Sequence, residues 1–300
     1  MATRELSGSP QMLPLFARAG AAMIPGASRL PLLGGLLSGG GHDVPDLTLR
    51  LNDVAIDGER LTAYDRVCGF DLRDAVPPTF PHILAFPLQL SLMTDASFPF
   101  PAIGLVHIYN RITQHRPIRR SERLNLAVWA TPLEEHPSGR QFSLRSEVRV
   151  GEELVWEETS TNLKRGRGTE DAPAPGSELP KAAELPSTGT WSLPGDLGRR
   201  YGAVSGDLNP IHMHPLSARV FGFKSAIAHG MWTKARCLAA LESRLPEAFT
   251  VEVAFKRPIF LPGKVEFCQQ RGPGEAFNLR FGVRDPREGR SHLDGLAFSG

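Results

Sequence analysis

The chain has 300 residues, of which 41% are hydrophobic, and this is enough to build the core of one large domain or of two ordinary ones. Its formal net charge is +2, and the sequence contains no block of like charge. Neither nucleic acid nor a membrane surface is therefore expected as a partner. The three cysteines show no Cys-x-x-Cys spacing, which argues against a disulfide framework or a zinc knuckle and for a reducing compartment. We therefore expect buried thiols and a cytoplasmic location.

The first 48 residues are interpreted as an N-terminal extension. Residues 12–37 are rich in Leu, Ala and Gly, but three prolines and two arginines interrupt them. A bilayer helix or a secretory signal would need an unbroken apolar run, so neither is expected. The stretch is predicted to form short amphipathic turns lying over a domain.

Residues 49–163 are predicted to form a first module of one helix and several strands. The helix is expected at 80–93, and Pro87 should kink it because proline removes a backbone hydrogen bond. Strands are expected at 103–111, 124–130, 141–149 and 154–160. The next residues, 164–188, are rich in Gly, Pro, Ala, Ser and charge, a composition typical of a linker.

Residues 189–300 are predicted to form a second module with the same order of elements. A short helix near 197–204 should stop at Gly206, and a polar loop follows it. Apolar residues at helical spacing predict a largely surrounded helix over 230–245. After it the hydrophobic period switches to two, which predicts strands at 249–255, 264–269, 276–284 and 292–298.

Several short patterns occur twice in the same order, which indicates an internal repeat. The pairs are Tyr64-x-x-Val67-x-Gly69 with Tyr201-x-x-Val204-x-Gly206, Arg116-Pro117-Ile118 with Arg257-Pro258-Ile259, and Phe142-x-Leu144-Arg145 with Phe277-x-Leu279-Arg280. A long buried helix followed by antiparallel strands predicts a sheet curled around a helix, and two copies could pair their sheets within one chain. The predicted fold class is α+β.

The polar loop of the second module carries the residues best suited to acid–base chemistry. Asp207 and His212 lie five residues apart, close enough to point at one water molecule. An aspartate is ionised near neutral pH and an imidazole titrates there, so the pair could pass protons to and from that water. Asn209 adds an amide that could orient it.

Gly230 offers a different kind of group. At the first turn of a helix its N–H has no acceptor within the helix, and the helix dipole favours negative charge there. A residue without a side chain lets a carbonyl oxygen approach this N–H. One such donor contributes about 3 kcal/mol to a transition state that carries an oxyanion.

Other interpretations of the cluster remain open at this point. Asp207, His212 and His214 could bind a metal, although no further ligand stands at an obvious spacing and none is expected to be bound. Asp and Asn also cap helices without any chemistry. His229, which stands among apolar residues, fits a structural hydrogen-bonding role better than that of an acid or base.

The segments Gly206-Asp207-Leu208-Asn209-Pro210-Ile211-His212 and Ala228-His229-Gly230-Met231 resemble the signature of the MaoC-like family, the (R)-specific or type-2 enoyl-CoA hydratases. The resemblance covers about 201–267 and includes Phe255-Lys256-Arg257-Pro258-Ile259; His214 departs from it, because many relatives carry an acidic residue there. It implies a double hotdog fold, in which each of two modules wraps an antiparallel sheet around a central helix. It also implies hydration of trans-2-enoyl thioesters to (R)-3-hydroxyacyl thioesters, or the reverse dehydration, in fatty-acid metabolism.

The resemblance also implies roles for individual residues. Asp207 and His212 would hold the catalytic water, and the Gly230 amide would polarise the thioester carbonyl without metal or organic cofactor. The residues expected to bind substrate are Asn209, His229, Met231, Lys256 and Arg257. The substrate would be an acyl-CoA or an acyl-carrier-protein thioester, and two-module chains could form a homodimer.

The first module lacks these reactive groups. In the repeat register Phe70, Leu72, Ala75 and Ile83 stand where the second module has Asp207, Asn209, His212 and Gly230. We therefore expect the first module to shape the acyl tunnel rather than to catalyse. Two alternatives stay open: a hotdog thioesterase, for which Glu242 lies far down the helix, and a non-catalytic subunit that binds acyl thioesters.

Overall fold

The computed structural model describes residues 2–21 and 43–299, and the chain divides into two compact units whose segments alternate along the sequence. The first unit comprises Met1–Ala55, His82–His107 and Arg123–Ala174, and the second comprises Ile56–Pro81, Ile108–Glu122 and Pro175–Gly300. Residues 56–81 and 108–122, assigned above to the first module, thus group with the second unit. The module boundaries derived from the repeat remain a prediction.

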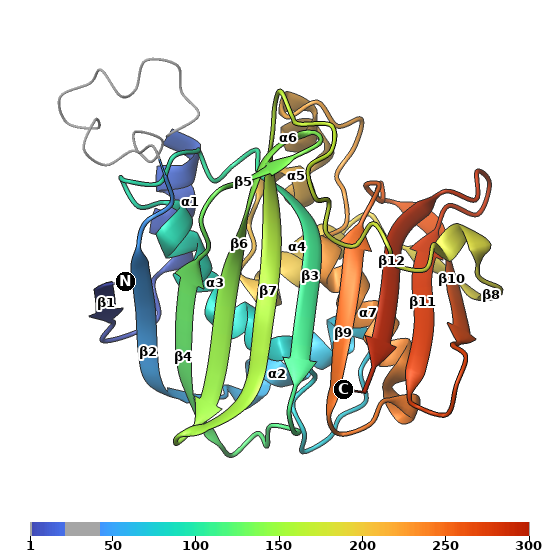
Figure 1. The fold of residues 1–300 in the computed structure, drawn as a ribbon, viewed down its shortest axis with the longest axis horizontal. Coiled ribbons are helices and arrows are strands. Elements are labelled where there is room, and N and C mark those ends of the chain that lie inside the picture. The colour runs from blue at the N-terminus through green and yellow to red at the C-terminus, as the bar shows by residue number, and fades with distance from the viewer. Residues whose placement is uncertain (1, 22–42, 300) are drawn as a thin grey trace. The chain divides into compact units, whose positions relative to one another are not determined.

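The first unit contains a sheet with the strand order β1-β2-β4-β6-β7, in which β5 pairs with β6 (Figure 1). The strands are β1 (Ala2–Glu5), β2 (Leu47–Ala55), β4 (Arg123–Ala130), β5 (Glu134–His136), β6 (Gly139–Val150) and β7 (Glu153–Arg165). The predicted strands at 124–130, 141–149 and 154–160 are confirmed as β4, β6 and β7. Alternate residues of β4 are buried, as expected of a sheet with one face against a core.

Two helices belong to this part of the chain, α1 (Met12–Ala21) and α3 (Phe80–Met93). Helix α3 matches the predicted bounds and continues through Pro87, so a kink at this residue remains a prediction. The turns expected over 12–37 are helix α1 as far as residue 21, and 22–37 lie outside the described residues. No helix in the described ranges is both long and apolar enough to cross a membrane.

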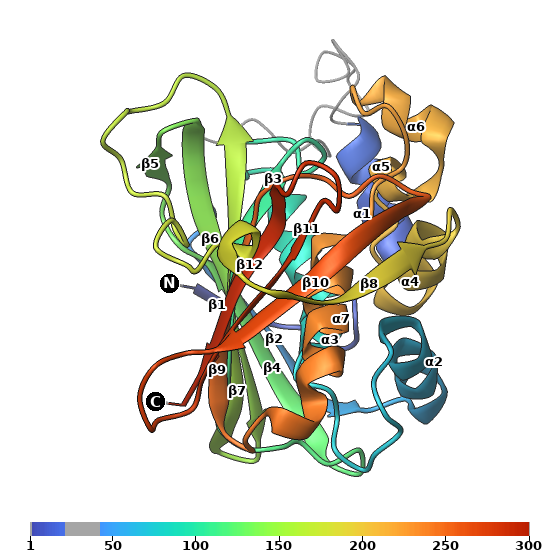
Figure 2. The same ribbon diagram turned by 90° about the vertical axis from the view of Figure 1, so that its right-hand side faces the viewer.

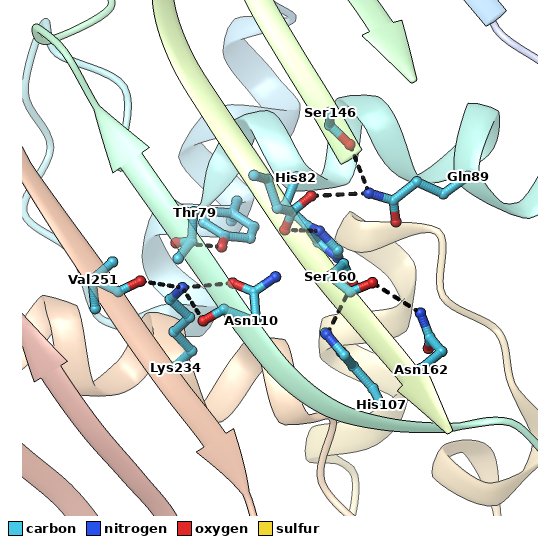
Figure 3. A network of polar contacts seen from close by, with 12 residues as sticks. Thr79, His82, Gln89, His107, Asn110, Ser146, Ser160, Asn162, Lys234 and Val251 are labelled. Carbon is cyan, nitrogen blue, oxygen red and sulfur yellow. Dashed lines mark hydrogen bonds and ion pairs between the residues drawn. The ribbon is translucent and has the colours of Figure 1, made fainter. Parts of the chain in front are cut away.

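Buried polar side chains attach α3 to the sheet of the first unit (Figure 3). The Glu158 carboxylate on β7 lies 2.7 Å from His82 Nδ1 and accepts a 2.9 Å hydrogen bond from Gln89 Nε2. Gln89 Nε2 also lies 3.0 Å from Ser146 Oγ on β6. Helix α3, whose sequence is mostly apolar, therefore carries buried polar side chains that are hydrogen-bonded to the sheet.

The second unit contains an antiparallel sheet in the order β3-β9-β12-β11-β10-β8 (Figure 1). The strands are β3 (Val106–Gln114, from residue 108 in this unit), β8 (Ser187–Leu193), β9 (Phe249–Phe255), β10 (Gly263–Arg271), β11 (Asn278–Arg284) and β12 (Ser291–Phe298). The five strands predicted from hydrophobic alternation in these regions are confirmed. Strand β8 was not predicted, because its polar, mostly exposed residues begin inside the stretch interpreted as a linker.

Helix α7 (Gly230–Leu241) lies along one face of this sheet (Figure 2) and confirms the central helix predicted over 230–245, followed by the 3-10 turn η3 (Glu242–Arg244). Lys234, at the centre of α7, is fully buried. Its ammonium donates to the Asn110 side chain at 2.5 Å and to the main-chain oxygens of Asn110 and Val251 at 3.3 and 3.2 Å (Figure 3). These bonds join α7 to β3 and β9.

The other helices of the second unit are α2 (Gly58–Cys68), η2 (Ala182–Glu184), α4 (Leu197–Ser205), α5 (Pro210–Met213) and α6 (Pro215–Val220). Helix α4 confirms the helix predicted near 197–204. The expected plain loop after it is wrong, because this region contains α5 and α6. Each begins with a proline that follows a polar capping residue, a pattern that starts helices since proline has no N–H to satisfy. The three cysteines are free and buried, as expected.

Candidate active site

The end of helix α4 sets the position of Asp207. Gly206 closes the helix in the left-handed conformation, with φ of 82°, and its N–H donates to the Gly202 carbonyl at 2.9 Å. A residue with a Cβ would be strained at this φ. Asp207 follows directly, and its side chain is 27% exposed.

Asn209 caps helix α5, as the structural alternative anticipated. Its Oδ1 accepts from the Ile211 N–H at 3.4 Å, while its own N–H donates to Asp207 Oδ1 at 3.1 Å. His214 likewise caps α6, since its Nδ1 accepts from the Leu216 N–H at 3.1 Å, and its ring is exposed. The loop chemistry therefore fixes Asp207 and the start of α5, but it leaves His214 outside the cluster.

His212 lies on α5 and is buried. Its Nδ1 is 2.8 Å from the Ile227 carbonyl oxygen, which can only accept, so Nδ1 carries the proton of the neutral ring. The other nitrogen, Nε2, then presents a lone pair. Burial lowers the pKa of His212, and the Asp207 charge and the Ile227 carbonyl oppose this shift without reversing it. The ring is consequently a neutral base near pH 7.

His229, which precedes α7, packs directly on His212. The two ring centroids are 3.7 Å apart with an interplanar angle of 26°. His229 Nε2 lies 3.1 Å from the Asp207 main-chain oxygen and 3.8 Å from its Oδ2. Burial, together with the neighbouring His212, lowers the pKa of His229 to about 3.

One ligand atom from each of Asp207, His212 and His229 lies within 4.8 Å of the other two. This group, and not the set with His214, is the one that could hold a metal ion or a water molecule. Three ligands of this kind also match the ligand count of a metal site that keeps an open position. A water also fits, because it can donate one O–H to the carboxylate and one to His212 Nε2, each over about 2.8 Å.

The absence of a side chain at Gly230 has a packing cause that the sequence did not reveal. A Cβ at this position would lie 2.9 to 3.2 Å from three atoms of the Phe255 ring. The Phe255 ring, at the end of β9, therefore fills the space where a Gly230 side chain would lie. A carbonyl oxygen cannot approach Gly230 from that side. The N–H of Gly230 remains a first-turn donor with no acceptor inside the helix.

The remaining predicted residues lie in two different environments. Met231 is buried in the first turn of α7, while Lys256 and Arg257 are exposed after β9. The segment after β9 lies beside the entry to α7, because the Ala228 N–H donates to the Ile259 carbonyl at 2.9 Å and the Leu261 N–H to the Ala226 carbonyl at 2.8 Å. Lys256 donates to the Gly176 carbonyl at 3.4 Å.

Glu242 lies at the far end of the central helix, as the sequence indicated when the thioesterase alternative was considered. Helix α7 has 12 residues, so its two ends are separated by about 18 Å. The Glu242 carboxylate accepts from the Asp71 N–H at 3.1 Å and lies 3.4 Å from Arg73 Nε. It is engaged away from Asp207 and His212, so a thioesterase gains no support from it.

Three groups of this site were not identified from the sequence. The Tyr201 ring lies against His229, with ring centroids 4.9 Å apart and an interplanar angle of 54°. It stands in the repeated Tyr-x-x-Val-x-Gly pattern, which was the only signal available. Ile227 contributes its main-chain oxygen and Phe255 contributes the volume of its ring. Neither contribution can be recognised from the residue types near the polar cluster.

Comparison with known proteins places the chain in a family. Residues 172–271 match the family model described as MaoC like domain. The chain is 36% identical over 251 residues to 3-hydroxyacyl-thioester dehydratase X of Mycobacterium tuberculosis, covering 83% of this chain and 88% of that protein.

Solved structures agree with this assignment. The crystal structure of HtdX of Mycobacterium tuberculosis is 34% identical, with a TM-score of 0.73 over 83% of this chain and 98% of that chain. A second mycobacterial protein, described as having a double hotdog fold, is 15% identical with a TM-score of 0.54 over 87% of this chain and 96% of its own. The double hotdog fold predicted from the sequence is therefore confirmed, and the chain belongs to the MaoC-like dehydratase family.

Proposed function

We propose that this protein is a hydro-lyase of fatty-acid metabolism, which adds water across trans-2-enoyl thioesters to give (R)-3-hydroxyacyl thioesters and catalyses the reverse dehydration. The observation that carries the proposal is the convergence of Asp207 and His212 within 4.8 Å of each other beside the first turn of α7. The mycobacterial relative, 3-hydroxyacyl-thioester dehydratase X, supports the same reaction class.

The first step uses the water held between Asp207 and His212. The lone pair on His212 Nε2 takes a proton from this water while the water oxygen forms a bond to C3 of the enoyl thioester. The Asp207 carboxylate accepts the second O–H and balances the charge that develops on the imidazole. General base catalysis of this kind contributes about 10²–10⁴-fold to the rate.

The second step concerns the electrons displaced from the double bond. They move onto the thioester oxygen as an enolate, and the Gly230 N–H, strengthened by the α7 dipole, stabilises that charge. The enolate then collapses and C2 receives the proton that the water released. Asp207 and His212 end in their starting protonation states, so the cycle needs no metal and no organic cofactor.

The thioester carrier is proposed to be coenzyme A or an acyl carrier protein, bound with the help of Asn209, Met231, Lys256 and Arg257. The exposed Lys256 and Arg257 are suited to phosphate groups, and their segment lies beside the entry to α7. Changing both to Ala should raise KM for crotonyl-CoA about tenfold, since each lost phosphate contact costs about 0.5–1 kcal/mol. The N-acetylcysteamine thioester, which has no phosphate, should be unaffected, and Lys264→Ala is the matched exposed control.

The reaction is tested by following the ultraviolet absorbance of the conjugated enoyl thioester with crotonyl-CoA and with a C16 enoyl-CoA. Loss of the band and formation of the (R) product support the proposal. Release of free thiol would instead indicate a thioesterase, and tight binding without loss of the band would indicate a non-catalytic subunit. A strong preference for C4 would contradict the idea that the first module shapes a tunnel for long chains.

We also propose that the enzyme works in the cytoplasm and that two chains associate as a homodimer. The near-neutral charge and the free, buried cysteines support the first of these statements. Light scattering of the purified protein measures the second directly, and a monomer mass would contradict it.

A further inference from the structure

Two aromatic rings pack against the His229 imidazole and restrict its orientation. The His212 ring stacks on it with centroids 3.7 Å apart, and the Tyr201 ring packs against it at an angle of 54° with centroids 4.9 Å apart. Only 3% of the His229 side chain is exposed. The imidazole is therefore confined to one plane inside the second unit.

The hydrogen bond of His229 fixes its tautomer. Nε2 lies 3.1 Å from the main-chain oxygen of Asp207, and a carbonyl oxygen can only accept, so Nε2 carries the hydrogen. Nδ1 then holds a lone pair, and among the described residues this buried atom has no hydrogen-bond partner. An unsatisfied buried acceptor costs about 1–3 kcal/mol, so its presence here needs a physical reason.

The charge state of His229 follows from its neighbours. Asp207 faces it from the segment after α4, and His212 faces it from α5. Two stacked imidazoles cannot both be protonated without strong repulsion. If His229 stays neutral, His212 is left as the one ring of the pair that can gain a proton from the catalytic water.

The bond between His229 and Asp207 also connects two parts of the proposed machinery. It joins residues 22 positions apart in the chain. Asp207 helps to hold the water, and His229 is directly followed by Gly230, whose N–H faces the developing enolate. A shift of about 1 Å between such groups can reduce a rate about 10²-fold.

We propose that His229 is a positioning residue: as a permanently neutral donor it ties the Asp207 backbone to the first turn of α7 and so sets the carboxylate against His212. The inference rests on the proposed function and replaces the substrate-binding role expected from the resemblance. A neutral side-chain amide can donate the same hydrogen bond at every pH, whereas an aliphatic side chain cannot.

The kinetic test compares His229→Leu with His229→Gln and His229→Asn. We expect H229L to lower kcat for crotonyl-CoA about 10–100-fold with KM within about threefold, and at least one amide variant to recover most of that loss. The pH profile of the recovered variant should keep both limbs of the wild type. His136→Gln, a histidine of the first unit, is the control that should leave kcat unchanged.

Three kinetic results would overturn the proposal. They are a rise in KM with kcat unchanged, an amide variant no better than H229L, and the loss of one limb of the pH profile in every variant. The first would restore the substrate-binding role, and the last would make His229 itself an acid or base.

Nitrogen NMR of the ¹⁵N-histidine-labelled wild type tests the same proposal without any substitution or activity. We expect the ring nitrogens of His229 to report a hydrogen on Nε2 and none on Nδ1, unchanged from pH 8 to pH 5. A proton on Nδ1, or titration within that range, would overturn the inference. If the wild type hydrates no enoyl thioester, the proposed function fails, and the NMR result still shows whether His229 is a fixed neutral donor.

Discussion

Replacing Gly230 by Ala separates the packing reason for this glycine from its chemical role. The new Cβ would lie 2.9 to 3.2 Å from three atoms of the Phe255 ring, which is rigid and held at the end of β9. Overpacking of this kind costs about 1–3 kcal/mol, while alanine returns up to about 1 kcal/mol of helix propensity. We expect a net loss of about 1–2 kcal/mol in the free energy of unfolding.

The same change should reduce turnover, because relief of the clash moves the first turn of α7 and with it the Gly230 N–H. Loss of one oxyanion donor lowers kcat about 10²–10³-fold. The assay is urea unfolding beside the initial rate with crotonyl-CoA, for G230A and for the double variant G230A with Phe255→Leu, which makes room for the methyl group. Gly189→Ala, whose Cβ would meet nothing within 4 Å, is the matched control.

The double variant should recover stability and part of kcat. A G230A protein with wild-type stability and wild-type kcat would refute both the packing argument and the oxyanion role. If the double variant recovers stability but no kcat, the packing argument holds. The position of the Gly230 N–H would then depend on the Phe255 ring itself.

Further predictions concern stability and metal dependence. Burial, reinforced by Glu242, raises the pKa of Asp65 to about 7. The native state therefore binds more protons than the unfolded state between about pH 4 and 7. The free energy of unfolding consequently falls as the pH rises through that window. Asp65→Asn should therefore raise the free energy of unfolding at pH 8 by up to about 4 kcal/mol and leave it unchanged at pH 4, and equal effects at both would contradict this. Lys234→Ala should destabilise more than Lys234→Met in urea, because Met keeps the buried stem packed, and the reverse order would be inconsistent with the packing. Dialysis against EDTA should leave kcat unchanged, whereas activity restored only by added zinc would show that Asp207 and His212 hold an ion.

Regular alternation and helical spacing were enough to predict most of the fold. Strand β9 was predicted with its observed bounds, because Phe249, Val251 and Val253 point to one side of the sheet. Helix α3 was likewise predicted to the residue. Strand β8 was missed because an exposed edge strand has no apolar face to reveal it, and its pairing with β10 is set by residues distant in sequence.

The candidate site was predicted as far as residue types allow. Asp207 and His212 stood out because a carboxylate and an imidazole five residues apart could share one water, and the family resemblance implied that role. The low pKa of His229 was not visible, since it depends on burial and on the neighbouring His212 ring. The tautomer of His212 was equally hidden, because the Ile227 carbonyl that fixes it is a main-chain group.

The compact units and the modules predicted from the repeat divide the chain differently, and the module boundaries stay a prediction. A repeat places residues 56–81 with the first copy, whereas contacts place them with the second unit. Helix α2 lies in this segment, and Arg60 donates from it to the Val204 carbonyl at 2.8 Å. This side-chain hydrogen bond links α2 to α4 within the second unit.

The most direct measurement is the turnover of crotonyl-CoA by Asp207→Asn, His212→Gln and the double variant, with unfolding curves to show that each is folded. If the two side chains share one water, each single change should lower kcat about 10²–10⁴-fold, and the double variant should be little worse than the poorer single one. Turnover that stays at the wild-type level in the folded double variant would contradict the account.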